Sequence, residues 1–330
     1  MKLNRRQLIG GAAVMAAMPG IPSAFAAVKE ETRDLVIVGG GPAGLSAALY
    51  ASRARLRAAV LHDGGGQVTS TPEIENYLGI DSIDGFELDR LFTEHAKRMG
   101  AELLTARAEK LTAGDVFAVE TRGGVLRARA VVLAMGATHR ELGLESEKRL
   151  FGAGVSYCAT CDGAFFRNKT VAVVGGGDTA VSDALYMSKL AAKVYLIHRR
   201  DEFRASKFLV ERAQARENIR FILSTVVEEV LGEDRVQGLR LRNVSNGNVG
   251  TLETDGLFVA VGIRPNSELV RGLVALDEGG FVVAGEDCKT SLPGIFAAGD
   301  LRTKPLRQIV CAVSDGAVAV ESALEYLETR

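Results

Sequence analysis

The chain has 330 residues, of which 47% are hydrophobic and 25% are charged, an ordinary composition for a globular protein of about two domains. Its 40 Lys and Arg residues nearly balance its 41 Asp and Glu residues, so the formal net charge of -1 gives no global field to attract nucleic acid or an acidic membrane surface. The 37 glycines concentrate in short clusters at the ends of expected strands, which indicates backbone packed against ligands.

The first 26 residues have the three regions of an export signal. Basic residues begin it, an apolar stretch follows, and Ala24-Phe25-Ala26 is a small-x-small cleavage site. The apolar stretch is too short for a lasting membrane anchor. The adjacent Arg5 and Arg6 resemble a twin-arginine signal, whose route exports proteins that have already folded around a cofactor. We expect a removable signal at 1–26 and a periplasmic protein. If the segment is only an amphipathic tail, the location is cytoplasmic.

A nucleotide-binding unit is expected directly after a charged linker. A buried strand at 35–38 leads into a G-x-G-x-x-G turn, a helix follows at about 43–53, and a second strand at 58–61 ends close to an acidic residue. Glycines in such a turn allow a pyrophosphate to approach, the helix N-terminus stabilises its charge, and the acid binds ribose hydroxyls. The residues expected to form this cradle are Gly39, Gly41, Pro42, Ala43, Gly44 and Asp63.

The same unit recurs from Val171 onward, aligned with the first without a gap and with a G-x-G-x-x-A turn. The alignment places Arg199 where the first unit has Asp63. Guanidinium groups can hold a 2′-phosphate, so the first unit is expected to bind FAD and the second NADPH in preference to NADH. A solvated loop is the alternative interpretation of this basic segment. The residues expected at the second site are Gly175, Gly177, Asp178, Thr179, Ala180, His198, Arg199, Arg200 and Arg204.

Near the C-terminus, an expected strand at 294–298 ends in Gly299-Asp300. A carboxylate at the end of a strand is well placed for the ribityl or ribose hydroxyls of a bound nucleotide, although Asp300 is also a common kind of turn residue. A helix is expected at about 307–327, and its N-terminus could stabilise negative charge on a reduced flavin.

Two of the four cysteines, Cys158 and Cys161, form a C-x-x-C between the two units. A zinc site would need two more ligands at short spacing, and neither Cys288 and Cys311 nor the four histidines provide them, so we expect no metal. An inert structural disulfide remains an alternative in an exported protein, but two nucleotide-binding units favour a redox dithiol. The adjacent Asp162 is a candidate proton shuttle for disulfide reduction, or a helix cap, or both.

Taken together, these motifs resemble the low-molecular-weight, bacterial-type thioredoxin reductases over nearly the whole chain from about residue 34. The C-A-T-C-D element combined with H-R-R-x-x-x-R is the most specific part of this resemblance. The resemblance adds candidate FAD contacts at Gly66, Gln67, Asn76, Gly136, Arg307 and Gln308. It also places Phe165-Phe166 where the family contacts its partner protein, although two apolar residues could equally be core.

The resemblance implies an α/β fold of two Rossmann-like dinucleotide-binding domains, the second inserted in the first. The FAD domain would take 32–141 plus 265–330, and the NADPH domain with the dithiol would take 142–264. It further implies a homodimer and a rotation of the inserted domain about hinge strands near Gly136 and Gly262. Electrons would pass from NADPH to FAD, to Cys158–Cys161, and then to thioredoxin or a similar protein disulfide, with Cys161 the thiol nearer the flavin.

Three features depart from the family pattern: a shortened segment before Gly65, Met135 in the usual Ala-Thr-Gly position, and the leader. The expected export signal at 1–26 conflicts with the expected use of NADPH, because NADPH is expected to be scarce outside the cytoplasm. Two other functions therefore remain open. One is an exported FAD dithiol oxidase that passes electrons to oxygen or another acceptor. The other is a non-catalytic flavoprotein that serves as a redox sensor or scaffold.

Overall fold

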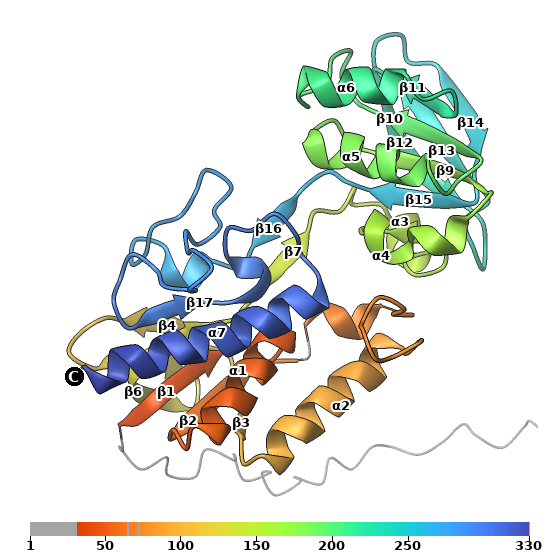
Figure 1. The fold of residues 1–330 in the computed structure, drawn as a ribbon. Helices are drawn as coiled ribbons and strands as arrows, with labels where there is room; N and C mark the ends of the chain where they lie inside the picture. Colours follow the sequence, from red (N-terminus) through yellow and green to blue (C-terminus); the bar gives the residue numbers. More distant parts are fainter. Residues whose placement is uncertain (1–31, 65, 72, 330) are drawn as a thin grey trace, which may run out of the picture.

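Two lobes joined by a pair of short strands make up the molecule (Figure 1), as seen in a computed structural model that describes residues 32–64, 66–71 and 73–329. The connecting strands are β7 (Ala137–His139) and β16 (Ile263–Pro265), which pair antiparallel. The lobe that holds both ends of the described chain is called the first lobe, and the one between β7 and β16 the second lobe. The predicted signal at 1–26 lies outside the described residues.

The first lobe is built on a seven-stranded sheet in the order β3-β2-β1-β6-β5-β4, with β17 also paired to β6. Strands β1, β2, β3, β6 and β17 run parallel, so their carboxyl ends meet at one edge. The strands are β1 (Arg33–Val38), β2 (Ala58–His62), β3 (Glu102–Thr105), β4 (Lys110–Thr112), β5 (Phe117–Thr121), β6 (Gly124–Leu133) and β17 (Ile295–Ala297). The helices are α1 (Pro42–Arg53), η1 (Gln67–Ser70), α2 (Gly85–Arg98), η3 (Glu268–Val270), η4 (Gly299–Leu301) and α7 (Ile309–Glu328).

The second lobe repeats this arrangement with a five-stranded parallel sheet in the order β11-β10-β9-β15-β8 and a separate antiparallel sheet, β12-β13-β14. Its strands are β8 (Val155–Ser156), β9 (Thr170–Val174), β10 (Lys193–Ile197), β11 (Ile219–Ile222), β12 (Thr225–Leu231), β13 (Gly238–Asn243), β14 (Val249–Glu253) and β15 (Gly256–Val259). Its helices are α3 (Glu145–Arg149), α4 (Ala159–Asp162), η2 (Gly163–Phe166), α5 (Asp178–Met187) and α6 (Lys207–Gln214).

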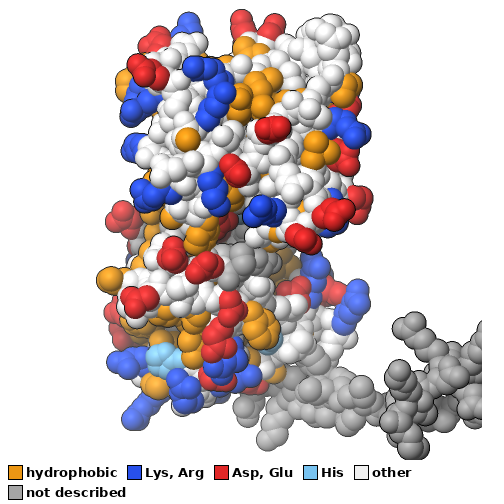
Figure 2. All heavy atoms as spheres, turned by 90° about the vertical axis from the view of Figure 1, so that its right-hand side faces the viewer, with side chains coloured by type: hydrophobic (Ala, Val, Ile, Leu, Met, Phe, Trp, Pro, Cys, Tyr) orange, Lys and Arg blue, Asp and Glu red, His pale blue; other side chains and the backbone are white. Residues whose placement is uncertain are grey.

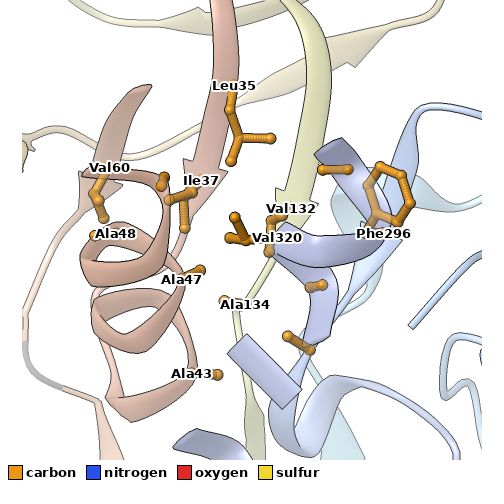
Figure 3. Packing of buried hydrophobic residues seen from close by; sticks show 14 of the residues in the cluster. Leu35, Ile37, Ala43, Ala47, Ala48, Val60, Val132, Ala134, Phe296 and Val320 are labelled. Carbon is orange, nitrogen blue, oxygen red and sulfur yellow. The ribbon is translucent and has the colours of Figure 1, made fainter. Parts of the chain in front are cut away.

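Two small-residue helices cover the centre of the first sheet (Figure 3). Leu35 and Ile37 of β1 are fully buried against α1 and against Val320 of α7. The helices approach closely because α7 carries Gly316, where an added Cβ would lie 2.1 Å from the Ala43 carbonyl oxygen of α1. This packing fixes the N-termini of α1 and α7 relative to the carboxyl edge of the sheet.

The predicted fold class is confirmed: the chain has an α/β fold with two dinucleotide-binding sheets, the second inserted between parts of the first. The domain boundaries at 141/142 and 264/265 stay a prediction; the first falls just after β7 and the second falls within β16. Charged side chains of both signs are mixed over the face seen in Figure 2. Among the described helices, none combines the length and the apolar character needed to cross a bilayer.

Candidate active site

The first glycine-rich turn is packed so tightly that side chains are excluded from it. Gly39 has a φ of +116°, and a Cβ there would lie 2.3 Å from the Ala134 carbonyl oxygen. At Gly44 a Cβ would lie 1.9 Å from the Gly39 carbonyl oxygen. Gly41 caps α1, and Pro42 occupies its first turn, where a missing N–H costs nothing. The turn therefore leaves the helix N-terminus open to an anion, as a dinucleotide requires.

The other predicted FAD contacts of the first lobe gather at the same edge. Asp63 follows β2 directly and is exposed, while Gly299 and Asp300 follow β17. Gly299 has a φ of +73°, and its Cβ position lies 3.0 Å from the Cβ of Ala43. The Oδ1 atom of Asp300 is buried and has no hydrogen-bond partner within the described residues. Burial raises the pKa of Asp300, which leaves a carboxyl group that a ribityl or ribose hydroxyl would satisfy.

Two further predicted FAD contacts lie next to strand β7 of the linking pair. The Gln67 amide donates to the Ala137 carbonyl oxygen of β7, and Gly136 adopts a φ of +66° just before that strand. Asn266, which the sequence did not single out as a site residue, donates from Nδ2 to the Met135 carbonyl oxygen at 2.8 Å. It also accepts from the Thr138 hydroxyl at 3.0 Å. Asn266 thus fixes the start of β7 to the residue that follows β16.

Arg307 and Gln308 lie immediately before α7. The Arg307 guanidinium stacks over the Phe281 ring at 4.1 Å, and its Nε atom has no partner within the described residues. The Gln308 Oε1 atom accepts from the exposed Asn76 amide at 3.0 Å. The contact with Gln308 brings Asn76, which is distant in sequence, to the N-terminus of α7. The residues of the first cradle therefore fit FAD: backbone and α1 for the pyrophosphate, and Asp300 for hydroxyl groups.

The second cradle repeats the packing of the first around different residues. Gly175 has a φ of +157°, and its Cβ position lies 2.3 Å from the Ala260 carbonyl oxygen. A Cβ at Gly176 would lie 2.0 Å from the Cε1 atom of His198, a close approach that the sequence analysis missed. Gly177 caps α5, and Asp178 in its first turn accepts from the Ser206 backbone N–H at 2.7 Å. Thr179 is exposed and Ala180 is fully buried beneath the turn.

The basic residues of the second cradle divide into a buried ring and an exposed cluster. His198 is 6% exposed, stacks on Phe203 at 5.3 Å, and leaves Nε2 without a partner within the described residues. Burial lowers the pKa of His198, a hydrogen bond with the backbone of Glu202 opposes this effect, and three neighbouring arginines lower the pKa further. Arg199, Arg200 and Arg204 are exposed, and none forms a salt bridge within the described part of the chain. Such unpaired guanidiniums fit the 2′-phosphate of NADPH.

The dithiol is a closed disulfide between Cys158 and Cys161. Cys158 precedes α4, and its Sγ atom accepts from the Cys161 backbone N–H at 3.2 Å. The Thr160 hydroxyl lies 3.4 Å from the same sulfur. Gln308 of the first lobe donates to the Thr160 hydroxyl at 3.1 Å, and its Nε2 atom is 3.8 Å from Cys161 Sγ. The disulfide therefore faces the first cradle, with Cys161 toward it.

Asp162 is partly buried beside this pair. Its Oδ2 atom accepts from the Ser156 hydroxyl at 2.6 Å, whereas Oδ1 is buried without a partner within the described residues. Burial raises the pKa of Asp162 and the Ser156 hydrogen bond lowers it, with a net rise. A carboxyl group with a raised pKa next to a disulfide is suited to supply a proton when the disulfide is reduced.

The remaining residues considered in the sequence analysis, two phenylalanines and two cysteines, are buried or half-buried. Phe166 is 8% exposed and packs edge-on against Phe258 at 5.2 Å, so it belongs to the core, while Phe165 is half-buried. Cys288 is buried, and Cys311 is half-buried in the first turn of α7. Burial raises the pKa of Cys288 to about 12. Within the described ranges, no group of three or more His, Cys, Asp or Glu residues is arranged to hold a metal ion.

The matched family model agrees with this geometry: residues 33–316 match the model described as pyridine nucleotide-disulphide oxidoreductase. The protein named thioredoxin reductase from Listeria monocytogenes is 44% identical over 306 residues, which cover 92% of this chain and 96% of that protein. A thioredoxin reductase structure from Streptococcus pyogenes is 42% identical with a TM-score of 0.87, covering 92% of this chain and all of that one.

A structure of Lactococcus lactis thioredoxin reductase in the "FR conformation" is 39% identical but has a TM-score of only 0.62 over 91% of this chain and 100% of that one. The chain thus has the fold and site of a pyridine nucleotide-disulphide oxidoreductase, a class that couples nucleotide cofactors to a redox disulfide. Within this class it belongs to the family of bacterial-type, low-molecular-weight thioredoxin reductases, which bind FAD and depend on NADPH.

Proposed function

We propose that the protein reduces the disulfide of thioredoxin or a thioredoxin-like protein, with electrons passing from NADPH to FAD, to Cys158–Cys161 and on to the substrate. The observation that carries the proposal is the contact of Gln308, at the edge of the first cradle, with Thr160 and Cys161 of the dithiol element. It puts the disulfide against the residues that would hold FAD. After reduction, one thiol attacks the substrate disulfide and the other resolves the mixed disulfide.

The test is anaerobic. The mature protein with its yellow cofactor is mixed separately with NADPH and NADH, and bleaching of the flavin absorbance is followed. Fast bleaching by NADPH, followed by reduction of added oxidised thioredoxin, is the expected result. Cys158→Ser should retain the bleaching and lose thioredoxin reduction, because only the second step needs the dithiol.

A second function is favoured by the leader alone. Export would place the protein where NADPH is scarce, and a dithiol oxidase that passes electrons to oxygen would avoid the need for it. No bleaching by either nucleotide, together with bleaching by a dithiol and rapid oxygen consumption, would establish this oxidase and overturn the reductase proposal.

Domain rotation is proposed as part of the cycle. The Cys158–Cys161 pair faces the first lobe, whereas α6 lies at the end of the second lobe that is farther from the first (Figure 1), and Arg199, Arg200 and Arg204 precede α6 in the chain. The nicotinamide and the dithiol therefore need two different arrangements of the lobes in order to reach the same flavin. The two TM-scores, 0.87 and 0.62 at similar identity and coverage, are consistent with two lobe arrangements among relatives. The strands β7 and β16 would act as the hinge.

Export by the twin-arginine route and assembly as a homodimer are likewise proposals. The basic start, the short apolar stretch and the small-x-small site of residues 1–26 support the first. Fractionation of cells expressing the full chain tests it: an Arg5→Lys, Arg6→Lys double substitution should retain the protein in the cytoplasm. The family resemblance supports the dimer. Light scattering of the purified protein should give twice the chain mass, and a single chain mass would contradict it.

A further inference from the structure

Ser156 connects the two ends of the dithiol element, which comprises residues 158–162, because it contacts both Cys158 and Asp162. It is the last residue of β8 and is 3% exposed. Its Oγ atom accepts the backbone N–H of Cys158 at 3.0 Å and lies 2.6 Å from Oδ2 of Asp162. The Cys158 carbonyl oxygen, at 3.3 Å, is a more distant acceptor for the single hydroxyl proton. The hydroxyl therefore donates to the carboxyl group and accepts from the cysteine backbone.

This arrangement makes the two carboxyl oxygens of Asp162 unequal. Oδ2 is occupied by the Ser156 hydroxyl, and Oδ1 is buried with no partner within the described residues. Helix α5 packs against α4 and contributes the half-buried Asp183, whose pKa is raised by burial to about 7. From the first lobe, the uncharged Gln308 donates hydrogen bonds to the dithiol element. The Ser156 hydroxyl is thus the polar group that fixes how Asp162 is oriented.

We propose that Ser156 is a positioning residue that orients Asp162 for the proton transfer accompanying reduction of the Cys158–Cys161 disulfide, an inference that rests on the proposed function. In this step the S–S bond breaks, two electrons that originate from NADPH enter, and one proton leaves Asp162. The products are one thiol, one thiolate and ionised Asp162, which regains its proton from solvent. With Oδ2 held by Ser156, Oδ1 is the oxygen that carries the proton.

Replacing Ser156 by Ala removes both the hydroxyl donor to Asp162 and the acceptor of the Cys158 backbone N–H, and the Asp162→Asn background separates the two effects. Proton transfer by a positioned side chain contributes about 10²–10⁴-fold to a rate, so loss of its orientation is expected to slow disulfide reduction roughly tenfold. The same hydrogen bond favours ionised Asp162. Loss of this hydrogen bond should therefore raise the pKa of Asp162. The decrease in rate that accompanies ionisation of Asp162 should then occur at higher pH. A role limited to packing would lower stability without moving this pH limb.

The experiment uses the FAD-loaded full chain under anaerobic conditions. Protein is mixed with excess NADPH across about pH 5 to 9, quenched with an alkylating reagent at set times, and the new thiols at Cys158 and Cys161 are counted by mass spectrometry. The variants are Ser156→Ala, Ser156→Thr, Asp162→Asn and the double variant Ser156→Ala/Asp162→Asn. Ser188→Ala is the matched control, because its hydroxyl donates to a backbone carbonyl of α5 at 2.8 Å, apart from the dithiol element.

Slow thiol formation and a displaced pH limb are expected for Ser156→Ala, with recovery in Ser156→Thr, which keeps a hydroxyl. In the Asp162→Asn background, Ser156→Ala should cause no further loss, because Ser156 acts through Asp162. An undiminished rate, an unmoved limb, or an equal loss with and without the Asp162 carboxylate would overturn the proposal. If wild-type protein forms no thiols with NADPH, the proposed function fails instead. Reduction by dithiothreitol then provides the same comparison of variants, since cleavage by exchange also releases a thiolate that needs a proton.

Discussion

The Gln308 Nε2 atom lies 3.8 Å from Cys161 Sγ, although Gln308 belongs to the first lobe and Cys161 to the second. The same amide donates to the Thr160 hydroxyl at 3.1 Å, and its oxygen accepts from Asn76. An N–H group at this distance stabilises negative charge on the sulfur as the disulfide opens. The contact therefore has two consequences: it favours the arrangement in which the dithiol faces the predicted FAD-binding residues, and it favours the thiolate.

Gln308→Ala is expected to slow transfer of electrons into the disulfide by about three- to tenfold, the equivalent of one net hydrogen bond. Stopped-flow absorbance of the NADPH-reduced protein measures this transfer, with flavin content checked separately because Gln308 is also a predicted FAD contact. Gln214→Ala, at the exposed end of α6, is the control and should leave the rate unchanged. An unchanged rate in Gln308→Ala would mean that the contact does not govern this arrangement.

Arg199→Ala is expected to weaken the use of NADPH by about tenfold or more, because a charged hydrogen bond to the 2′-phosphate contributes about 1.5–3 kcal/mol. NADH lacks that phosphate, so its KM should stay nearly constant. The comparison of KM values for the two nucleotides is the measurement. Arg216→Ala, another exposed arginine of the second lobe, is the matched control. Equal weakening of both nucleotides would assign the arginine to the pyrophosphate or to general steering.

Gly44→Ala is expected to abolish stable FAD binding. An added Cβ would lie 1.9 Å from the Gly39 carbonyl oxygen, so α1 must move away from the end of β1. Forced overpacking of this kind costs about 1–3 kcal/mol or more. Flavin content and thermal unfolding measure the effect. Gly250→Ala is a suitable control, because nothing lies within 4 Å of its Cβ position. A yellow, normally stable Gly44→Ala protein would show that the turn is not the FAD cradle.

Local sequence patterns closely predicted the strand and the helix that flank the first glycine-rich turn. The strand expected at 35–38 corresponds to β1 (Arg33–Val38), and the helix expected at about 43–53 corresponds to α1 (Pro42–Arg53). These elements follow from an apolar run, a glycine turn and a small-residue helix, all of which are local properties. Gly39 and Gly175 were identifiable for the same reason, since a tight strand-to-helix turn requires glycine wherever it occurs.

Contacts between distant segments could not be predicted in this way. Nothing in the residues around Ser156 indicates that its hydroxyl binds Asp162, because the turn between them depends on how β8 and α4 meet. Asn266 carries no signal of its role until β7 and β16 are paired. The contact of Gln308 with Thr160 depends on the relative position of two lobes, which no local pattern encodes.

The buried cluster of Asp315, Arg302 and Lys304 gives a prediction about stability. Asp315 of α7 accepts from Arg302 and Lys304 at 2.7 Å each, and the three side chains are 4–10% exposed. Its Oδ2 atom also accepts the backbone N–H of Gly299, which begins the predicted FAD segment, at 2.9 Å. Asp315→Asn would leave two buried cations without a counter-charge and should lower the free energy of unfolding by about 3–5 kcal/mol.

The pH dependence of this cluster has a definite sign. Burial raises the pKa of Asp315, but hydrogen bonds from Arg302 and Lys304 outweigh it and hold the pKa below its ordinary value. A lowered folded-state pKa contributes stability that is present above the unfolded value of about 3.9 and is lost as pH falls below it. Denaturant unfolding between about pH 3 and 7 should therefore show a smaller acid-dependent loss in Asp315→Asn than in the wild type. Glu325→Gln, in the exposed pair with Lys289, is the control and should change stability by less than about 1 kcal/mol. Equal effects of the two substitutions would mean that burial does not strengthen the Asp315 cluster.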